Sequence, residues 1–227
     1  TLLAENDFVG MTFWLATSIM LASTVFFFME RSDVNGKWRT SMTVAGLVTG
    51  VAFWHYLYMR DAHLMGEVTT VFRYIDWLIT VPLQIVEFYL ILSAVTIVSI
   101  MLFWRLLGAS LVMLVFGFLG EAGLIDATIG FVIGMAGWGY ILYEIFSGEA
   151  SKLSEASGNA GGQFAFNTLR WIVTAGWLIY PVGYFLGYLW GGTDAGTVNI
   201  VYNIADLVNK TAFGLAIWAG AKMDTKA

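Results

Sequence analysis

Seven long hydrophobic runs, separated by short polar segments, dominate the chain. A bilayer with a hydrocarbon core about 30 Å thick is crossed by a helix of roughly 20 mostly apolar residues. Runs suited to this task are found at residues 8–29, 40–59, 70–93, 105–120, 124–146, 164–190 and 198–221. The pattern predicts an all-α membrane protein whose fold is a seven-transmembrane-helix bundle.

The segments between the runs are short and polar. Residues 30–39 and 60–69 are expected to form loops, and residues 121–123 a tight turn. Residues 147–162 are rich in Ser, Gly and Glu, so we expect them to be the longest flexible connection. No internal repeat and no second domain can be recognised, and residues 1–227 are therefore expected to form a single seven-helix domain.

The Lys and Arg residues outside the runs predict the orientation, because cytoplasmic loops carry the excess of positive charge. Arg60 stands alone on one face. The other face collects Arg31, Lys37, Arg39, Arg105, Lys152, Arg170, Lys222 and Lys226. This distribution predicts an N-terminus outside and a C-terminus in the cytoplasm. The first residue is Thr1 rather than Met, which is expected of a processed or shortened start, and no cleavable signal pattern is recognisable.

Composition agrees with a membrane protein and excludes several functions. Hydrophobic residues make up 59% of the chain and charged residues only 12%, whereas soluble domains carry about 25% charge. A net charge of −5 disfavours nucleic-acid binding, which needs a basic face. The absence of Cys excludes disulfides, thiolate metal sites and cysteine nucleophiles. With two His and no HExxH pattern, we expect no metal site.

Five charged residues lie inside the hydrophobic runs, where each costs several kcal/mol unless it is paired or hydrated. They are Arg73, Asp76, Glu87, Asp206 and Lys210. Asp76 and Glu87 are 11 residues apart, which is about three helical turns and roughly 16 Å of rise, so they share one face at two depths. Asp206 and Lys210 are four residues apart and face the same way.

This spacing suggests a proton relay. Lys210 can lie between the carboxylates of Asp76 and Asp206, and Arg73 nearly neutralises the group. Glu87 stands alone in an apolar stretch, where burial disfavours the charged form, so we expect it to be protonated at rest. One acid would then act as the donor and another as the acceptor.

A purely structural reading exists for each of these residues. Acids within membranes can simply connect helices, and an ion triad around Lys210 can be structural. His55, taken alone, is more often a packing residue, and Trp and Tyr residues commonly form interface belts. The five charges together favour a functional site.

Three segments carry the sequences RYIDWLITVPLQIVEFYLIL, WLIYPVGY and ADLVNKTAFG, in the third, sixth and seventh runs. In these, and over all seven runs, the chain resembles the microbial rhodopsins, specifically the proteorhodopsins of marine bacteria. The resemblance implies a blue-absorbing, light-driven outward proton pump in the inner membrane of a bacterium, surrounded by lipid. It further implies a photoreceptor transporter rather than an enzyme.

The resemblance gives each charge inside the runs a role. It implies all-trans retinal bound covalently to Lys210 as a protonated Schiff base. Asp76 would be the counterion and proton acceptor, and Asp206 the second counterion. Glu87 would return a proton from the cytoplasmic side, and Arg73 would link the complex to the outer surface.

Three further positions refine these expectations. His55 matches a histidine that hydrogen-bonds the acceptor acid. The combination of Asp76, Thr80 and Glu87 is the family's outward proton-pump pattern. Gln84 matches a position where Leu gives green and Gln gives blue absorption, because a polar side chain there favours the ground-state charge distribution of the chromophore.

The resemblance also implies the walls of the pocket and an assembly. Besides Thr80 and Gln84, the residues expected to contact retinal are Trp77, Met113, Trp138, Trp177, Tyr180 and Pro181. Trp14 matches a residue that meets His55 of a neighbouring protomer, which implies a ring-shaped homo-oligomer, a pentamer or hexamer.

Two alternative functions remain open at this stage. A sensory rhodopsin with a slow photocycle would use the same chromophore to signal to a membrane partner, although the carboxylic donor Glu87 favours a pump. A weaker alternative is a seven-helix transporter without photochemistry, which would show no visible absorption after addition of retinal.

Overall fold

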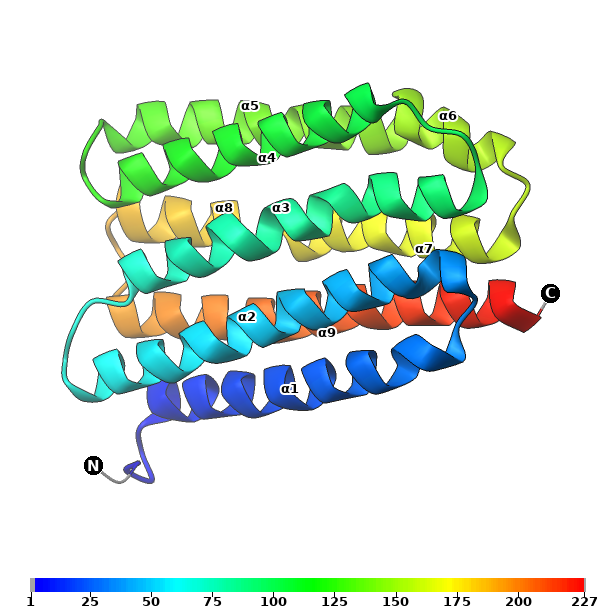
Figure 1. Cartoon of the computed structure of the whole chain (residues 1–227). Coiled ribbons are helices and arrows are strands. Elements are labelled where there is room, and N and C mark those ends of the chain that lie inside the picture. Colours follow the sequence, from blue (N-terminus) through cyan, green and yellow to red (C-terminus); the bar gives the residue numbers. More distant parts are fainter. Residues whose placement is uncertain (1–2, 227) are drawn as a thin grey trace.

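The computed structural model describes residues 3–226, which fold into an antiparallel bundle of helical rods with the two ends of the chain at opposite ends of the bundle (Figure 1). The helices are α1 (Phe8–Glu30), α2 (Arg39–Leu64), α3 (Thr70–Val95), α4 (Ile100–Glu121), α5 (Ala127–Phe146), α6 (Glu149–Ala156), α7 (Ala160–Trp171), α8 (Ile179–Tyr184) and α9 (Ala195–Lys226). The helices α7 and α8 lie in line and form one rod, and the short α6 follows α5. The predicted seven-helix bundle is confirmed.

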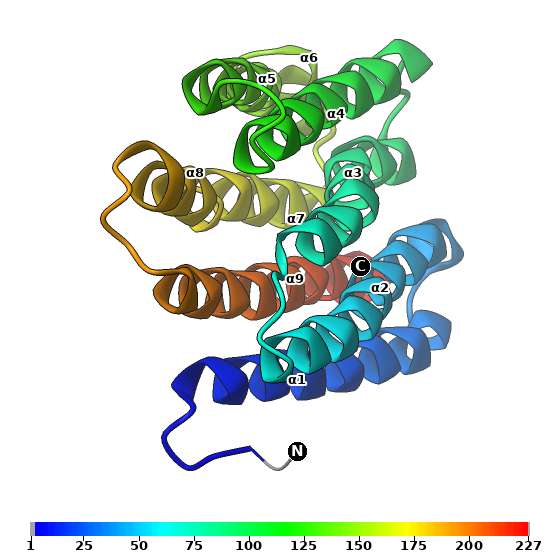
Figure 2. The ribbon, with the colours of Figure 1, turned by 90° about the vertical axis from the view of Figure 1, so that its left-hand side faces the viewer.

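The rods lie in layers (Figure 2). The helix α1 packs against α2 and α9, and α4 packs against α5 and α3. Between these pairs, α3 faces α7, and α7 packs along α9. The buried faces of α2, α3, α7 and α9 therefore meet in the middle of the bundle.

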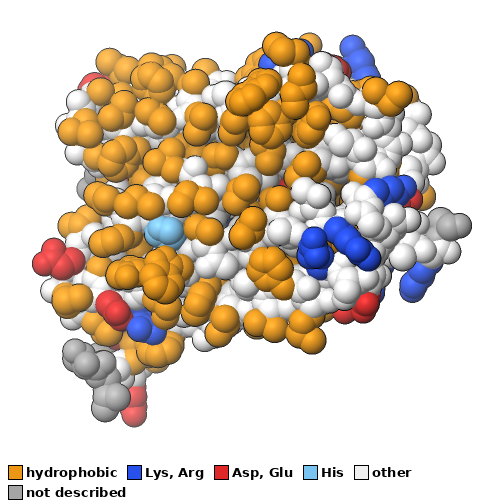
Figure 3. All heavy atoms as spheres, viewed as in Figure 1, with side chains coloured by type: hydrophobic (Ala, Val, Ile, Leu, Met, Phe, Trp, Pro, Cys, Tyr) orange, Lys and Arg blue, Asp and Glu red, His pale blue; other side chains and the backbone are white. Residues whose placement is uncertain are grey.

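The outer surface fits a lipid environment. Among the described residues, five helical stretches are long and apolar enough to cross a membrane: Phe8–Asp33, Thr70–Val95, Ile100–Glu121, Ala127–Ala156 and Ala160–Leu189. The two remaining rods, α2 and α9, are more polar, and α9 buries Asp206, Asn209 and Lys210 toward the bundle interior. Figure 3 shows hydrophobic side chains over most of one face, with Lys and Arg gathered toward the C-terminal end.

Short polar side chains begin several helices. Asp7, Ser99, Asp126 and Asn159 each accept a hydrogen bond from a backbone N–H in the first turn that follows, which satisfies a donor that has no partner within the helix. Glycines with positive φ, where a side chain would be strained, follow the ends of the rods at positions 66, 123, 158 and 191.

The connections are more helical than expected. Residues 147–162 were predicted to be flexible, which is wrong, because they contain α6 and the first residues of α7. The Glu144 carboxylate accepts a hydrogen bond from the Glu149 backbone N–H at 3.1 Å, and Arg105 pairs with both acids. Similarly, the predicted loops at 60–69 and 30–39 are shortened by α2, which continues to Leu64, and by two 3-10 turns.

The sixth rod is not a regular α-helix. Between α7 and α8 lies a π-helical turn, Ile172–Gly176, and a second one, Phe185–Leu189, follows α8. At the first turn, the Gly176 carbonyl accepts a hydrogen bond from the Asn209 side chain of α9 at 2.9 Å. A π turn widens the helix and is frequent at functional sites, and this one lies immediately before Trp177.

Candidate functional site

Lys210 lies at the centre of the bundle between two carboxylates. Its Nζ atom is 3.1 Å from Oδ2 of Asp76 on α3 and 3.2 Å from Oδ2 of Asp206, one turn earlier on α9. Both carboxylates are fully buried, and Lys210 is 2% exposed. The structure thus brings together the three residues that the helical spacing placed at one depth.

The two carboxylates differ in their hydrogen bonding. Asp206 accepts hydrogen bonds from the hydroxyls of Tyr56 and Tyr180, each at 2.7 Å, and from Nε1 of Trp77 at 3.2 Å. Oδ2 of Asp76 accepts from Lys210, whereas its Oδ1 has no hydrogen-bond partner among residues 3–226. Since donors stabilise a carboxylate charge, Asp206 is the better-stabilised anion, and Asp76 keeps an oxygen free to take a proton.

His55 approaches Asp76 without bonding to it. Its Nδ1 is 4.0 Å from Oδ1 of Asp76 and 2.9 Å from the carbonyl oxygen of Val51. The expected hydrogen bond to the acid is therefore not formed in this structure. The contact that is present is electrostatic and depends on the protonation of the imidazole.

Arg73 lies three residues before Asp76 on α3 and is surrounded by polar side chains. Its guanidinium donates to the side-chain oxygens of Asn199 and Asn203 at 3.0 and 2.8 Å and to the Tyr56 hydroxyl at 3.2 Å. The nearest carboxylate oxygen, on Asp206, is 3.9 Å away. Tyr56 therefore connects the arginine to the carboxylate.

Glu87 is isolated from this network. It lies on the same buried side of α3 as Asp76, toward the C-terminal end of that helix, and is fully buried. Neither carboxyl oxygen has a hydrogen-bond partner within the described chain, and Ser41 of α2 is its polar neighbour. An unpaired carboxylate in such a place is costly, so the neutral acid is the form that the surroundings favour.

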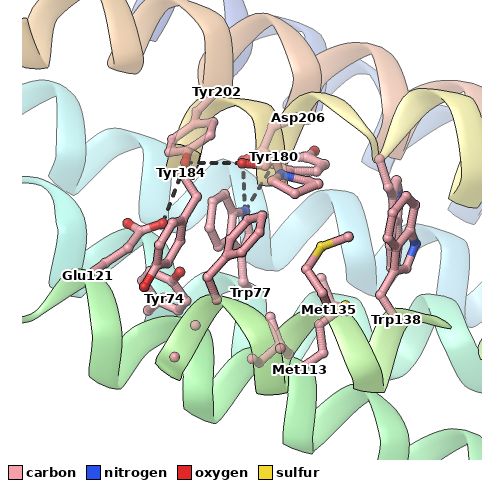
Figure 4. Close-up of a pocket in the computed structure, with 18 of the residues that line it drawn as sticks. Tyr74, Trp77, Met113, Glu121, Met135, Trp138, Tyr180, Tyr184, Tyr202 and Asp206 are labelled. Carbon is pink, nitrogen blue, oxygen red and sulfur yellow. Dashed lines mark hydrogen bonds between the residues drawn. The ribbon is translucent and has the colours of Figure 1, made fainter. Parts of the chain in front are cut away.

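A cavity of about 110 Å³ extends from Lys210 between α3, α4, α5 and the sixth rod (Figure 4). Aromatic side chains form much of its wall, with Met113 and Met135 on one side. Of the residues expected to contact a chromophore, those lining it are Trp77, Gln84, Met113, Trp138, Trp177, Tyr180 and Pro181. Thr80 is not among the lining residues; it is fully buried and donates to the Asp76 carbonyl oxygen at 3.0 Å.

Several polar residues of the site were not singled out from the sequence. Asn203, Tyr202 and Asn199 precede Asp206 by three, four and seven residues, which is helical spacing that predicts a shared face. Glu121 was placed in a turn, but it is the last residue of α4 and lines the cavity, where the Tyr202 hydroxyl donates to it at 3.4 Å (Figure 4).

Comparison with known proteins identifies the class. A family model described as "Bacteriorhodopsin-like protein" matches residues 7–223. The chain therefore belongs to the bacteriorhodopsin-like family of microbial rhodopsins, which are light-driven transporters rather than enzymes.

Individual relatives narrow this assignment. Over 216 residues the chain is 56% identical to a blue-light absorbing proteorhodopsin of Gamma-proteobacterium Hot 75m4, covering 94% of this chain and 86% of that one. It is also 56% identical over 218 residues to a green-light absorbing proteorhodopsin of Gamma-proteobacterium EBAC31A08, with 95% and 87% covered. The crystal structure of a blue light-absorbing proteorhodopsin from Med12 superimposes with a TM-score of 0.84 at 62% identity, covering 96% of this chain and 100% of that one.

With these identities the chain is a member of the proteorhodopsins and a multi-pass membrane protein. Blue-absorbing and green-absorbing relatives are equally similar to it, so identity alone does not assign its colour. Membership of the family implies a retinal chromophore. The cavity fits such a group: it is largely aromatic, Lys210 lines it, and the Gln84 side chain facing it has a buried Nε2 without a hydrogen-bond partner in the described residues.

Proposed function

We propose that this chain is a light-driven outward proton pump, with residues 1–227 acting as one retinal-binding domain. The observation that carries the proposal is the unequal pair of carboxylates around Lys210. Asp206 is held by three side-chain donors, while Asp76 has one oxygen free and lies 3.1 Å from the lysine nitrogen. A pump needs this combination of a fixed counter-charge and a separate acceptor.

Retinal, when bound as all-trans chromophore through a protonated Schiff base to Lys210, supplies a light-driven change of shape and a proton on the nitrogen. Trp77 and Trp177 lie in the cavity wall and restrict the directions in which a long polyene can move. Asp76 is placed to receive the proton. Asp206 stays ionised and keeps the site close to neutral together with Arg73.

Glu87 acts as the proton donor on the cytoplasmic side. A neutral acid without hydrogen-bond partners holds a proton in an apolar region until water or a base reaches it. Its position on α3, about three turns from Asp76, separates the donor from the acceptor. This retained carboxylic acid favours a pump over the alternative, a slow sensory rhodopsin.

Blue absorption is the finer part of the proposal. Gln84 is 2% exposed, lines the cavity and has an unpartnered amide nitrogen. An amide dipole beside the chromophore stabilises the ground-state charge distribution relative to the excited state, which widens the energy gap.

We further propose a bacterial inner-membrane location and a ring-shaped homo-oligomer of five or six copies. Trp14 is 45% exposed on α1, with the Arg60 guanidinium 4.1 Å from its ring centroid. Such an exposed aromatic group is available to a neighbouring protomer, and His55 of α2, whose side chain is 14% exposed, is the residue that it would meet there.

The test is illumination, in unbuffered medium, of cells or of vesicles in which the orientation of the protein is known. Outward acidification that a protonophore abolishes, and that Asp76→Asn eliminates, is expected. Full pumping by Asp76→Asn would refute the assignment of the acceptor. A photocycle lasting seconds with no net pH change would favour the sensory alternative.

A further inference from the structure

Asp224, near the cytoplasmic end of α9, connects three parts of the chain. Its Oδ2 accepts hydrogen bonds from Nε1 of Trp38 and Nζ of Lys37, each at 2.8 Å. Its Oδ1 accepts from the side-chain amide of Asn159, the residue that caps α7. The side chain of Asp224 is only 6% exposed, although it lies in the last turns of the helix.

The backbones of α7 and α9 are in close contact at the same place. A Cβ atom added to Gly161 would lie 2.4 Å from the Gly220 carbonyl oxygen, and one added to Gly220 would lie 2.6 Å from that of Gly161. Neither glycine position therefore has room for a side chain. The hydrogen bond from Asn159 to Asp224 keeps α7 and α9 together at the start of α7.

This contact between α7 and α9, with the hydrogen bonds of Asp224, lies between Glu87 and the cytoplasm. Beyond Glu87, the large buried side chains of Phe88 and Phe166 form an edge-to-face pair with ring centroids 5.2 Å apart. Trp38 and Ala221 are fully buried in the same hydrophobic cluster. A proton from the cytoplasm reaches Glu87 only if these groups separate and admit water. The helix that can move away from α9 is α7, because the π turn at residues 172–176 interrupts the sixth rod directly after α7.

We infer that Asp224 is a positioning residue for proton uptake: its carboxylate ties α7 and the α1–α2 connection to α9 and keeps the cytoplasmic route to Glu87 closed. This inference rests on the proposed pump, because only a pump must refill Glu87 from that side. Opening the route breaks a hydrogen bond between the Asn159 amide and a charged carboxylate. The strength of that bond therefore sets how often the route opens.

The chain offers a matched control at the same end of the bundle. Glu30 of α1 accepts hydrogen bonds from Nε1 of Trp218 and Nζ of Lys222, each at 2.8 Å. This carboxylate has the same types of donor as Asp224 and also joins another helix to α9. Within residues 3–226, its hydrogen-bond and ion-pair partners are on α9 and none is on α7, so its loss should not release α7.

The variants are Asp224→Asn, Asn159→Ser and the control Glu30→Gln. Ser keeps an oxygen that can cap α7 but is too short to reach Asp224. In the dark, we measure hydrogen–deuterium exchange of the backbone amides of residues 160–169. We expect Asp224→Asn and Asn159→Ser to exchange at least about ten-fold faster than the unaltered chain, as for the loss of a hydrogen bond to a charged group. Glu30→Gln should stay within about two-fold.

Proton uptake after a light flash, followed with a pH-indicating dye on the cytoplasmic side, provides the second measurement. Uptake should accelerate in Asp224→Asn and Asn159→Ser, while proton transfer to Asp76 keeps its rate. Equal exchange rates in Asp224→Asn and Glu30→Gln, or unchanged exchange and uptake in Asn159→Ser, would overturn the inference. If the unaltered chain moves no protons in light, the proposed pump fails, and the dark exchange still decides whether Asp224 holds α7.

Discussion

Replacing Tyr56 by Phe tests the role of the hydroxyl that connects Arg73 to Asp206. The hydroxyl donates to Asp206 at 2.7 Å and accepts from Arg73 at 3.2 Å, and all three side chains are buried. The variant keeps the ring and its packing, so the loss is confined to two hydrogen bonds with charged groups. Each such bond contributes roughly 1.5–3 kcal/mol, and both ions keep other partners, so we expect a total loss of about 2–4 kcal/mol.

The assay is the free energy of unfolding of the retinal-loaded protein in one detergent, measured by denaturant titration. Tyr58→Phe is the control, because Tyr58 lies on the same helix two residues later and is 49% exposed. That variant should lose less than about 0.5 kcal/mol, as is usual for surface substitutions. Equal losses in the two variants would refute the claim that Tyr56 bridges the buried charges.

Three further predictions concern colour, proton return and the outer surface. Gln84→Leu should shift the visible absorption maximum to longer wavelength, because the polar group beside the chromophore is lost; an unchanged spectrum would contradict this. Glu87→Gln should slow recovery of the resting state after a flash by at least about ten-fold, as expected for loss of general-acid help, and unchanged recovery would remove Glu87 from the donor role. Asp7 lies just before α1; burial opposes its charge, but the Gly10 backbone N–H and His63 hold the pKa of its carboxyl below the ordinary value. Because this pKa is lower in the folded than in the unfolded protein, the carboxylate stabilises the fold above about pH 4 and loses this effect as the pH falls through the folded pKa. Asp7→Ala should therefore cost about 1 kcal/mol of unfolding free energy at pH 7 and progressively less toward pH 3, and a pH-independent loss would contradict the assignment.

Much of the site followed from the sequence because charges within apolar helices are rare and helical spacing fixes their faces. The spacing of Asp206 and Lys210 on one helix, together with the similar depth of Asp76 on another, predicted a lysine between two acids. The distances around Lys210 agree with that prediction. The seven helices followed in the same way from the length of the hydrophobic runs.

What the sequence left out depends on how the helices pack. Tyr56 on α2 reaches Asp206 on α9, and an uncharged tyrosine in an apolar run does not stand out as the partner of a charge on another helix. The unequal hydrogen bonding of Asp76 and Asp206 also depends on donors from other helices and could not be predicted from the sequence. Glu121 was missed because it lies at a helix end, where a polar residue usually indicates a turn.

The connections were misjudged for a related reason. Ser, Gly and Glu in residues 147–162 indicate flexibility by composition, yet Arg105 on α4 pairs with Glu144 and Glu149 and fixes the start of α6. The π turns likewise depend on a partner, since the Gly176 carbonyl is satisfied by Asn209 of another helix. Local propensity was overridden in both places by contacts between helices.

The proposed pump requires that Asp76, with its free oxygen, takes the proton while the fully bonded Asp206 remains ionised. Time-resolved infrared spectroscopy of the illuminated protein measures this directly, because a carboxylate that gains a proton produces a carbonyl stretching band. We expect a band that appears after the flash, shifts in the ¹³C-aspartate-labelled protein and is absent in Asp76→Asn. A band that persists unchanged in Asp76→Asn would contradict it.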